Sequence, residues 1–345
     1  MDPLTQGVVG AVLPQTTHKR SLMLLAGLFG LVGGMAPDLD TLIRSEHDPL
    51  LYLEYHRQFT HSLLFIPVGG LICAALLHFL IGRRQSISFL QTYIFCSLGY
   101  ATHGLLDAAT SYGTMLFWPF SDLRVAWSYI SIIDPLFTLP VMALVLLSAW
   151  FKTARYARAG LVWGVLYIGA GAYQNHSAEA MGMEIAKARG HEPDALSVKP
   201  SFGNLLVWKV IYRHGNIYYV DAVRVGWQPT VYPGTSIVAL DIPRDFPWLD
   251  PNSQQANDIE RFRWFSKGYL AKDPLNSDRI IDLRYSFIPN QINGLWSIEL
   301  SAKADEEDHA NFVTHGRPGA EGRRLLWQMV VGQQAISEAL LSEVR

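Results

Sequence analysis

The chain has 345 residues and a formal net charge of −2 at pH 7; half of its residues are hydrophobic and 17% are charged. This length suits about two domains. The near-neutral charge, without a basic stripe, excludes nucleic acid as an expected partner.

Charged residues are distributed unevenly along the chain. Residues 1–174 contain only 19 of the 58 Asp, Glu, Lys and Arg residues, and residues 175–345 contain the other 39. Few charges combined with long apolar runs are typical of a membrane-embedded chain. We therefore expect residues 1–174 to form a helical membrane domain, and residues 175–345 to form a soluble domain.

Five apolar segments of 16 to 23 residues occupy the first half: 21–36, 62–81, 87–109, 132–151 and 158–174. At a rise of about 1.5 Å per residue, these lengths are within or just below the range that spans a bilayer. A shorter segment, 4–14, is expected to be tilted, re-entrant or packed against its neighbours. Buried core helices of a soluble protein are the alternative, but the scarcity of internal charges favours a polytopic membrane domain.

The loops between these segments predict an orientation. Lys and Arg concentrate in alternate loops, with seven in one set (Lys19, Arg20, Arg83, Arg84, Lys152, Arg155 and Arg158) and three in the other (Arg44, Arg57 and Arg124). Because cytoplasmic loops carry the excess of Lys and Arg, the first set is expected to be cytoplasmic. The nine acids of the first half then lie on the opposite side, and so does the C-terminal domain.

The second half has the pattern of an α+β, mainly β, domain. The run NLLVWKVIYRHGNIYYVDAVRV contains two strand-like stretches around Gly215 and Asn216, which is a hairpin signal. Further strands are expected in IIDLRYSFI and LWSIEL. The stretch SQQANDIERFRWFSKGYLA has helical spacing, and GQQAISEALLSEV is expected to close the chain as a helix. Between them, ADEEDHANFVTHGRPGAEG is expected to be a solvated loop.

Acids and histidines gather on the predicted non-cytoplasmic side, at the ends of four apolar segments. The candidates for a metal site are Asp38, Asp40, His56, His61, His103, Asp107 and Asp134. Imidazole and carboxylate groups are the ligands of zinc, manganese and iron. Each residue also has a simpler reading: the histidines could be interfacial, Asp38 and Asp40 could form a turn, and Asp134 could cap a helix with Pro135 in its first turn. Because ionisable groups at membrane depth are expensive, their co-location favours a functional site.

The motifs MDPLTQGVVGA, GGMAPDLD, HRQFTHSLL, YATHGLLDAATSYGTMLFWPFSD and IIDPLF together resemble the YdjM family, described as inner-membrane, metal-dependent hydrolases, some under LexA control. The resemblance covers residues 1–140. It implies a multi-pass protein of the bacterial inner membrane. It also implies a metal site formed by six residues: Asp38, Asp40, His56, His61, His103 and Asp107. Many members have Thr-His where this chain has Thr5-Gln6, which leaves open whether Gln6 enters the site. The C-terminal half is similar to an extension found in a subset of the family.

The function expected from the sequence is therefore hydrolysis by a bound divalent metal ion, with zinc favoured over manganese. Asp134 is a candidate ligand or general base, and Arg57 is expected to hold an anionic substrate. A site at the outer membrane face favours a membrane lipid or lipid-linked phosphoester as substrate. The alternatives are a non-catalytic scaffold with a structural metal and a transporter of metal or solute. A transport path needs polar groups through the full membrane depth, whereas these cluster on one side.

Overall fold

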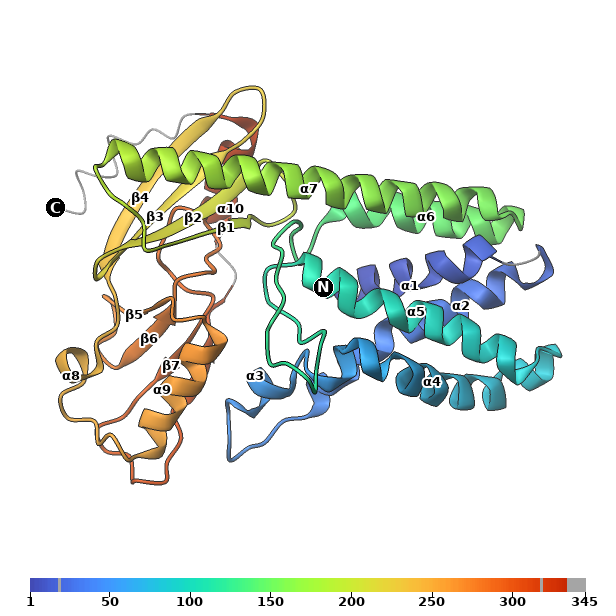
Figure 1. The fold of residues 1–345 in the computed structure, drawn as a ribbon, viewed down its shortest axis with the longest axis horizontal. Coiled ribbons are helices and arrows are strands. Elements are labelled where there is room, and N and C mark those ends of the chain that lie inside the picture. Colours follow the sequence, from blue (N-terminus) through green and yellow to red (C-terminus); the bar gives the residue numbers. More distant parts are fainter. Residues whose placement is uncertain (18–19, 317–318, 334–345) are drawn as a thin grey trace. The chain divides into compact units, whose positions relative to one another are not determined.

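The computed structural model of the protein describes residues 1–17, 20–316 and 319–333 (Figure 1). The chain divides into two compact units. The first contains Met1–Ile43 and Glu54–Ala172, and the second contains Arg44–Leu53 and Tyr173–Arg345. Each unit has hydrophobic cores of its own, and each is described separately.

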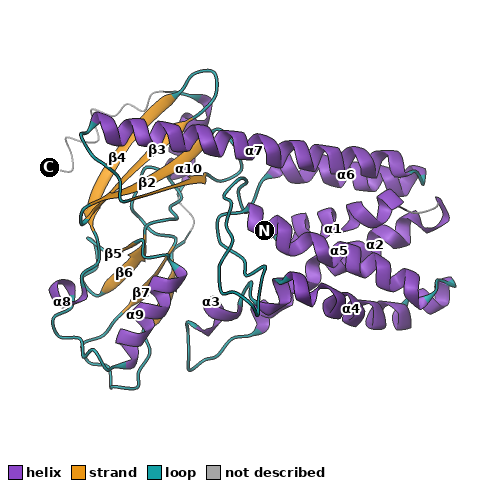
Figure 2. Cartoon of the chain, in the orientation of Figure 1, coloured by secondary structure: helices purple, strands orange, loops and turns teal. Residues whose placement is uncertain are grey.

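The first unit is helical (Figure 2). Its longer helices are α1 (Pro3–Thr17), α2 (Met23–Met35), α4 (Ile66–Leu80), α5 (Phe89–Ala109), α6 (Pro135–Phe151) and the first part of α7 (Ala154–Ala188). Helix α1 packs on α2, α5 and α6, and α5 packs on α2 and α4. Buried Phe29, Phe95 and Tyr100 fill the core between α2, α4 and α5.

Glycines allow three of these helices to approach closely. A Cβ atom at Gly99 of α5 would overlap the backbone of Gly30 in α2. A Cβ atom at Gly10 of α1 would lie 2.8 Å from the Cα atom of Gly34 in α2. Small residues at such positions are the usual way to bring helix backbones together in a membrane. The close approach positions the ends of α2 and α5, which carry the acids and histidines.

Short local elements set the directions of the chain around these helices. Helix α2 continues directly into a 3₁₀ helix, Ala36–Leu42. After the short helix α3 (Leu51–Tyr55), two 3₁₀ turns, Phe59–His61 and Leu63–Phe65, lead into α4. Helix α5 starts with a capping box in which Ser88 and Gln91 bond reciprocally.

Two of the described segments, Arg20–Leu42 and Leu63–Leu80, are long and apolar enough to cross a membrane. The helix Pro135–Phe151 is apolar but shorter. The sequence predicted five spanning segments. The polytopic arrangement therefore stays a prediction.

The second unit contains two antiparallel sheets. One has β1 (Ala195–Pro200), β2 (Val207–His214), β3 (Ile217–Arg224) and β4 (Thr230–Val238) in that order, and the other has β5 (Leu270–Lys272), β6 (Arg279–Asp282), β7 (Trp296–Glu299) and β8 (Asn311–Thr314). Its helices are α8 (Ile242–Asp245), α9 (Gln254–Phe265) and α10 (Ala320–Val331). Trp208, Val210 and Val223 of the first sheet pack against Ala178 of α7. A helical region followed by antiparallel sheets is the order of structure expected from the sequence.

Several local predictions in this unit are confirmed. His214 pairs with Ile217 across a two-residue turn at Gly215 and Asn216, and Gly215 has the positive φ of 60° that such turns require. Helix α9 buries Ile259, Phe262 and Phe265 on one face, as its spacing predicted.

Other local predictions in this unit were incomplete. The stretch expected to be a solvated loop contains β8 and the start of α10, because short edge strands carry little alternation for the sequence to reveal. The closing helix predicted over 332–344 lies almost entirely outside the described residues.

The segment Arg44–Leu53 belongs to the second unit although it precedes α4 in the chain. Both guanidinium Nη atoms of Arg261 donate to the carboxylate of Asp48, at 3.0 and 2.8 Å. Arg261 also donates to buried Asp258, at 2.8 Å, and Asp258 contacts Nδ1 of His309 at 2.9 Å. This paired arginine attaches the segment to α9 by a bidentate interaction, the stronger kind of ion pair.

Candidate metal centre

The first pair of acids follows the end of α2. Asp38 and Asp40 lie in the 3₁₀ helix Ala36–Leu42, which begins when Pro37 removes a backbone N–H donor from the α-helical ladder. Asp40 is buried, and the side chain of Asp38 keeps 15% of its surface exposed. The centre is therefore closed around Asp40 and reaches solvent beside Asp38.

The second contribution comes from α5. His103 and Asp107 are one helical turn apart and both are completely buried. Nδ1 of His103 lies 2.6 Å from the carbonyl oxygen of Gly34 in α2, so this nitrogen carries the proton and donates it. The other ring nitrogen, Nε2, then presents its lone pair toward the acids.

The third contribution is His61, in the turn before α4. Its Nε2 lies 2.8 Å from His103 Nε2, 3.5 Å from Asp38 Oδ1 and 3.3 Å from Asp107 Oδ2. His103 Nε2 lies 3.4 Å from Asp38 Oδ1 and 3.7 Å from Asp107 Oδ2. Four ligand atoms from three separate parts of the chain thus surround one point.

Three of these five separations, 3.3, 3.4 and 3.5 Å, match the ligand spacing of a single metal ion, and the other two, 2.8 and 3.7 Å, lie on either side of it. Tetrahedral zinc, with bonds of about 2.0–2.2 Å to nitrogen and oxygen, places its ligand atoms about 3.3–3.5 Å apart. Asp107 Oδ2 is buried and, among the described residues, accepts no hydrogen bond of good geometry. Two imidazole nitrogens and two carboxylates are also a suitable donor set for manganese. The residues present therefore fit a divalent metal ion.

A second group lies beside the first and consists of Asp38, Asp40 and His56. His56 Nδ1 is 2.8 Å from Asp40 Oδ1. Asp40 Oδ2 accepts hydrogen bonds from the backbone N–H of Arg57, at 3.0 Å, and from the Thr60 hydroxyl, at 2.8 Å, and lies 3.2 Å from His61 Nδ1. Because both oxygens of Asp40 are already engaged, this carboxylate is placed to orient the two imidazoles rather than to bind a metal directly.

Comparison with known proteins gives the chain a family. Residues 1–178 match the family described as YdjM inner membrane protein, which is slightly more than half of the chain. The chain belongs to the YdjM family. The resemblance predicted from the sequence motifs is thus confirmed.

Two relatives of this YdjM-family chain extend the comparison. The "Uncharacterized protein YfhP" of Bacillus subtilis (strain 168) is 23% identical over 263 residues, 74% of this chain and 76% of that protein. The "Inner membrane protein YbcI" of Escherichia coli (strain K12) is 32% identical over 108 residues, 30% of this chain and 60% of that protein. The alignment with YfhP is too long to fit within the first 178 residues, so it reaches into the second unit. No solved structure matches the chain.

Arg57 lies inside the centre of this YdjM-family protein. Its Nε atom is 3.0 Å from Asp107 Oδ2, Nη1 donates to the Thr110 hydroxyl at 3.1 Å, and the guanidinium lies over the ring of Tyr112 at 4.7 Å. Its backbone has a φ of 65°, a left-handed conformation that is strained for a residue with a side chain. The bonds of its N–H to Asp40 and of its carbonyl oxygen to Met115 hold that conformation.

The charges around His56 and His61, which are both buried, differ. Burial lowers the pKa of His56, which keeps its imidazole neutral near pH 7. Burial also acts to lower the pKa of His61, but the hydrogen bonds that its imidazole donates to Asp107, Asp38 and Asp40 outweigh burial and raise that pKa. Three carboxylates around one imidazole therefore favour a positive charge at this point, which either a proton or a metal ion can supply.

Gln6 joins the centre through Asp107. Its Nε2 donates to Asp107 Oδ1, at 2.8 Å, and the backbone amino group of Met1 pairs with the same oxygen. The question left by the Thr5-Gln6 motif stays open: the Gln6 side chain contacts Asp107, and its own Oε1 atom is buried without a hydrogen-bond partner among the described residues. Sequence reasoning missed Thr110, Tyr112 and Arg124, whose guanidinium donates to the carbonyl oxygen of His56 at 3.0 Å. All three occur in or shortly after the YATHGLLDAATSYGTM motif, and their proximity to it was the available signal.

The structure does not bring Asp134 into either group of candidate ligands. Asp134 is the N-cap of α6, where it accepts the backbone N–H of Phe137, and its carboxylate accepts the Tyr167 hydroxyl at 2.9 Å. This is the helix-capping role that the sequence predicted, on the basis of Pro135, as the alternative to a role in the metal site. The six other predicted ligands do lie together.

Proposed function

We propose that this YdjM-family chain is a membrane-bound, metal-dependent hydrolase that acts at the non-cytoplasmic face of the inner membrane. The observation that carries the proposal is the group of four ligand atoms from Asp38, His61, His103 and Asp107. Structural zinc sites are usually closed by Cys and His ligands. A set of two imidazoles and two carboxylates suits a reactive centre better.

Zinc is our first choice for the ion, because three of the separations between these atoms, 3.3 to 3.5 Å, suit its tetrahedral geometry; manganese is the second choice. A divalent ion held by these residues supplies a Lewis acid and lowers the pKa of a bound water toward neutrality. Gln6 and Arg57 support the Asp107 carboxylate, and the Gly34 carbonyl oxygen and Asp40 fix the rings of His103 and His61.

His56 is the group best placed to move a proton. Asp40 holds its Nδ1, so the proton is exchanged at Nε2, as in other carboxylate–imidazole pairs. Its lowered pKa keeps it able to accept a proton near pH 7. Arg57 adds a permanent positive charge beside the ligands, which favours an anionic substrate.

A lipid or lipid-linked phosphoester is the proposed substrate class. The four ligands lie at the ends of apolar helices, on the side that the Lys and Arg distribution predicts to be non-cytoplasmic. Five membrane crossings, with the second unit on that same side, complete the proposed topology.

Metal content tests the centre. Detergent-purified protein, incubated with zinc and washed, is expected to contain about one metal ion per chain by plasma mass spectrometry. His61→Ala and Asp107→Ala are expected to lose it, because each removes one of four ligands. Asp134→Asn is the matched control, since it changes a buried carboxylate outside the centre and should keep the ion. A well-folded wild type that binds neither zinc nor manganese would falsify the proposal.

Turnover tests the chemistry. The zinc-loaded protein is expected to release inorganic phosphate from hexadecyl phosphate in mixed micelles. His56→Ala is expected to keep its metal but to lower the rate by about 10²–10⁴-fold, the range for loss of a general base. Equal rates in the two proteins would remove His56 from the mechanism.

A further inference from the structure

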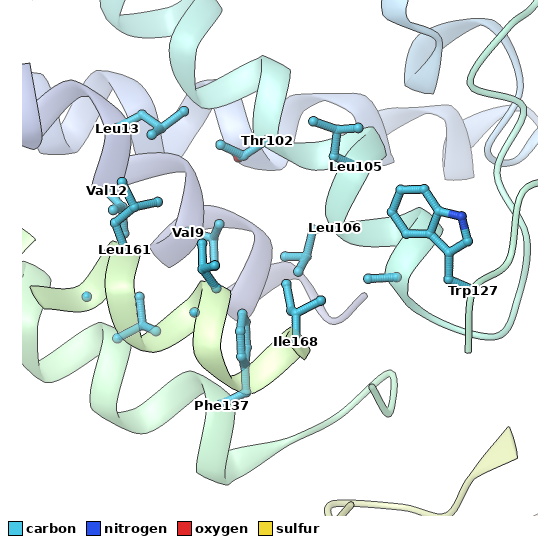
Figure 3. A pocket seen from close by; sticks show the side chains of 15 residues that line it. Val9, Val12, Leu13, Thr102, Leu105, Leu106, Trp127, Phe137, Leu161 and Ile168 are labelled. Atoms are coloured by element: carbon cyan, nitrogen blue, oxygen red, sulfur yellow. The ribbon is translucent and has the colours of Figure 1, made fainter. Parts of the chain in front are cut away.

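The first unit contains an apolar cavity of about 350 Å³ between α1, α5, α6 and α7 (Figure 3). Val9, Leu106, Phe137, Leu161 and Ile168 are among its lining side chains. Helix interfaces in proteins are normally packed without voids larger than a water molecule. A hollow of this size, at the small end of the range for ligand sites, therefore calls for an occupant.

The cavity is open on one side. Leu105 of α5 is 47% exposed, and Leu161 and Val165 of α7 are 39% and 63% exposed. These side chains form an apolar mouth between α5 and α7. In a bilayer such a mouth faces hydrocarbon, so an apolar chain can enter it from the membrane without contact with water.

The other end of the cavity lies next to the metal centre along two helices. On α5, the lining residue Leu106 immediately precedes Asp107 and is three residues after His103. On α1, the lining residue Val9 is three residues after Gln6, which donates to Asp107. Residues three apart in a helix are neighbours on its surface. One helical turn thus separates the apolar lining from the polar centre.

We propose that this cavity holds the hydrocarbon chain of the substrate, with the anionic head group of the same molecule at the metal centre. The inference rests on the proposed function and deepens it: the substrate is an amphiphile with one apolar chain beside its phosphate. The charges support this pairing, because Arg57 and the metal site favour an anion while the lining is apolar. A helix of a second protein does not fit, since its diameter of about 10 Å exceeds so small a hollow.

Gly164 provides a way to fill the cavity. It lines the hollow on α7, and a Cβ atom there would be in ordinary contact with the Phe137 ring at 3.7 Å. Gly164→Leu therefore adds a side chain at the cavity wall without forcing the backbone. Gly169→Leu is the matched control: it lies on the same helix, outside the lining, and a Cβ atom there has nothing within 4 Å.

The test is photolabelling of the full chain in lipid nanodiscs with zinc, using two probes that carry a diazirine in the middle of a sixteen-carbon chain. The phosphate probe is hexadecylphosphonate, whose C–P bond the proposed hydrolase does not cleave, and the other probe is hexadecanol. Peptide mass spectrometry is expected to find the phosphate probe attached to cavity residues such as Val9 and Leu106. Gly164→Leu should reduce that attachment about tenfold or more, and Gly169→Leu should not. Asp107→Ala should weaken labelling by the phosphate probe more than labelling by the alcohol.

The outcomes separate this inference from the proposed function. Metal bound by the wild type, with label spread over exposed helix faces and unchanged by Gly164→Leu, overturns the cavity proposal while the metal centre stands. Cavity labelling that does not distinguish the two probes in Asp107→Ala overturns the placement of the head group. A wild type that labels the cavity but binds no metal overturns the hydrolase and supports only the binding of the chain. Gly164→Leu is required to retain its metal, which shows that the variant is folded.

Discussion

Asp40 distinguishes a residue that binds the metal from one that orients ligands. Its two oxygens contact His56 Nδ1, the Arg57 N–H, the Thr60 hydroxyl and His61 Nδ1. Replacing such a supporting group typically weakens metal affinity about 10–100-fold. We therefore expect Asp40→Asn to bind zinc stoichiometrically at saturation but with an affinity lowered by that factor, measured by competition with a chelator.

Two references frame this measurement. Asp134→Asn should leave the affinity unchanged, and His103→Ala should abolish stoichiometric binding. If Asp40→Asn behaves like His103→Ala, Asp40 is itself a ligand, and the second group of Asp38, Asp40 and His56 then becomes the better metal site.

Asp134 is expected to contribute to stability and not to metal binding. Asp134→Ala removes the N-cap of α6 and leaves the Tyr167 hydroxyl without its acceptor. Loss of a cap costs about 1 kcal/mol, and loss of the hydrogen bond from the half-buried Tyr167 hydroxyl costs about 0.5–1.5 kcal/mol more. The expected result is a lower midpoint of thermal unfolding in detergent with unchanged metal content. Lost metal at an unchanged midpoint would contradict the capping role.

The residue types of the centre could be predicted from the sequence, but their separate roles could not. Asp, His and Arg gather in short motifs that the predicted topology puts on one side, and this was enough to name the six candidate ligands. The role of Asp40 depends on the Thr60 hydroxyl and the Arg57 N–H, which come close only through the turn at Arg57. Asp134 is also an aspartate at the end of an apolar segment, like the candidate ligands. Only its contacts with Phe137 and Tyr167 distinguish it from them.

At the scale of elements, the glycine contacts between α2 and α5 position the ligands. Asp38 follows the end of α2, and His103 lies one turn beyond Gly99 in α5. A Cβ atom at Gly99 would overlap the Gly30 carbonyl group, so Gly99→Ala must push the two helices apart. We expect a loss of stability of about 1–3 kcal/mol and weaker zinc binding.

Gly169→Ala provides the control for the same substitution. A Cβ atom at Gly169 of α7 meets nothing, and alanine is the better helix former by about 1 kcal/mol. This variant is expected to be as stable as the wild type or more so, with full metal content, in parallel thermal unfolding and metal assays. Equal stability of Gly99→Ala and the wild type would mean that α2 and α5 do not need this close contact.

Elements with strong local signals were the ones that the sequence predicted. The β2–β3 hairpin has a Gly-Asn turn between two β-rich runs, and α9 has a repeating apolar face. Strand β8 has four residues and α7 continues from an apolar into a polar stretch, so neither has a single period along its length. Helix α7 continues past residue 174 because residues 175–188 are mostly good helix formers, with Gly182 tolerated inside the helix, and it ends just before Gly190, which has a φ of 75°.

For the whole molecule, the sequence did not predict that Arg44–Leu53 belongs to the second unit, because the contact between Asp48 and Arg261 joins residues 213 positions apart. This contact constrains topology. If the second unit is water-soluble, as the sequence predicts, it lies on one side of a bilayer, and Arg44–Leu53 then shares that side with the chain after residue 172. The number of crossings between them is then even. A crossing by Leu63–Leu80 alone would give an odd number, whereas the predicted crossings by α4, α5, α6 and α7 give an even one.

Cysteine labelling tests this topology on intact cells. In a background with Cys73 and Cys96 replaced by alanine, single cysteines are placed at the exposed positions Glu46, Gln85 and Asn252. Glu46→Cys and Asn252→Cys are expected to react with a membrane-impermeant maleimide. The excess of Lys and Arg predicts that the other set of loops is cytoplasmic, which leaves positions 46 and 252 on the non-cytoplasmic side. Gln85→Cys should react only after permeabilisation. Labelling of positions 46 and 252 from opposite sides would contradict the even number of crossings, whereas labelling of both only after permeabilisation would keep that number and place the metal centre at the cytoplasmic face.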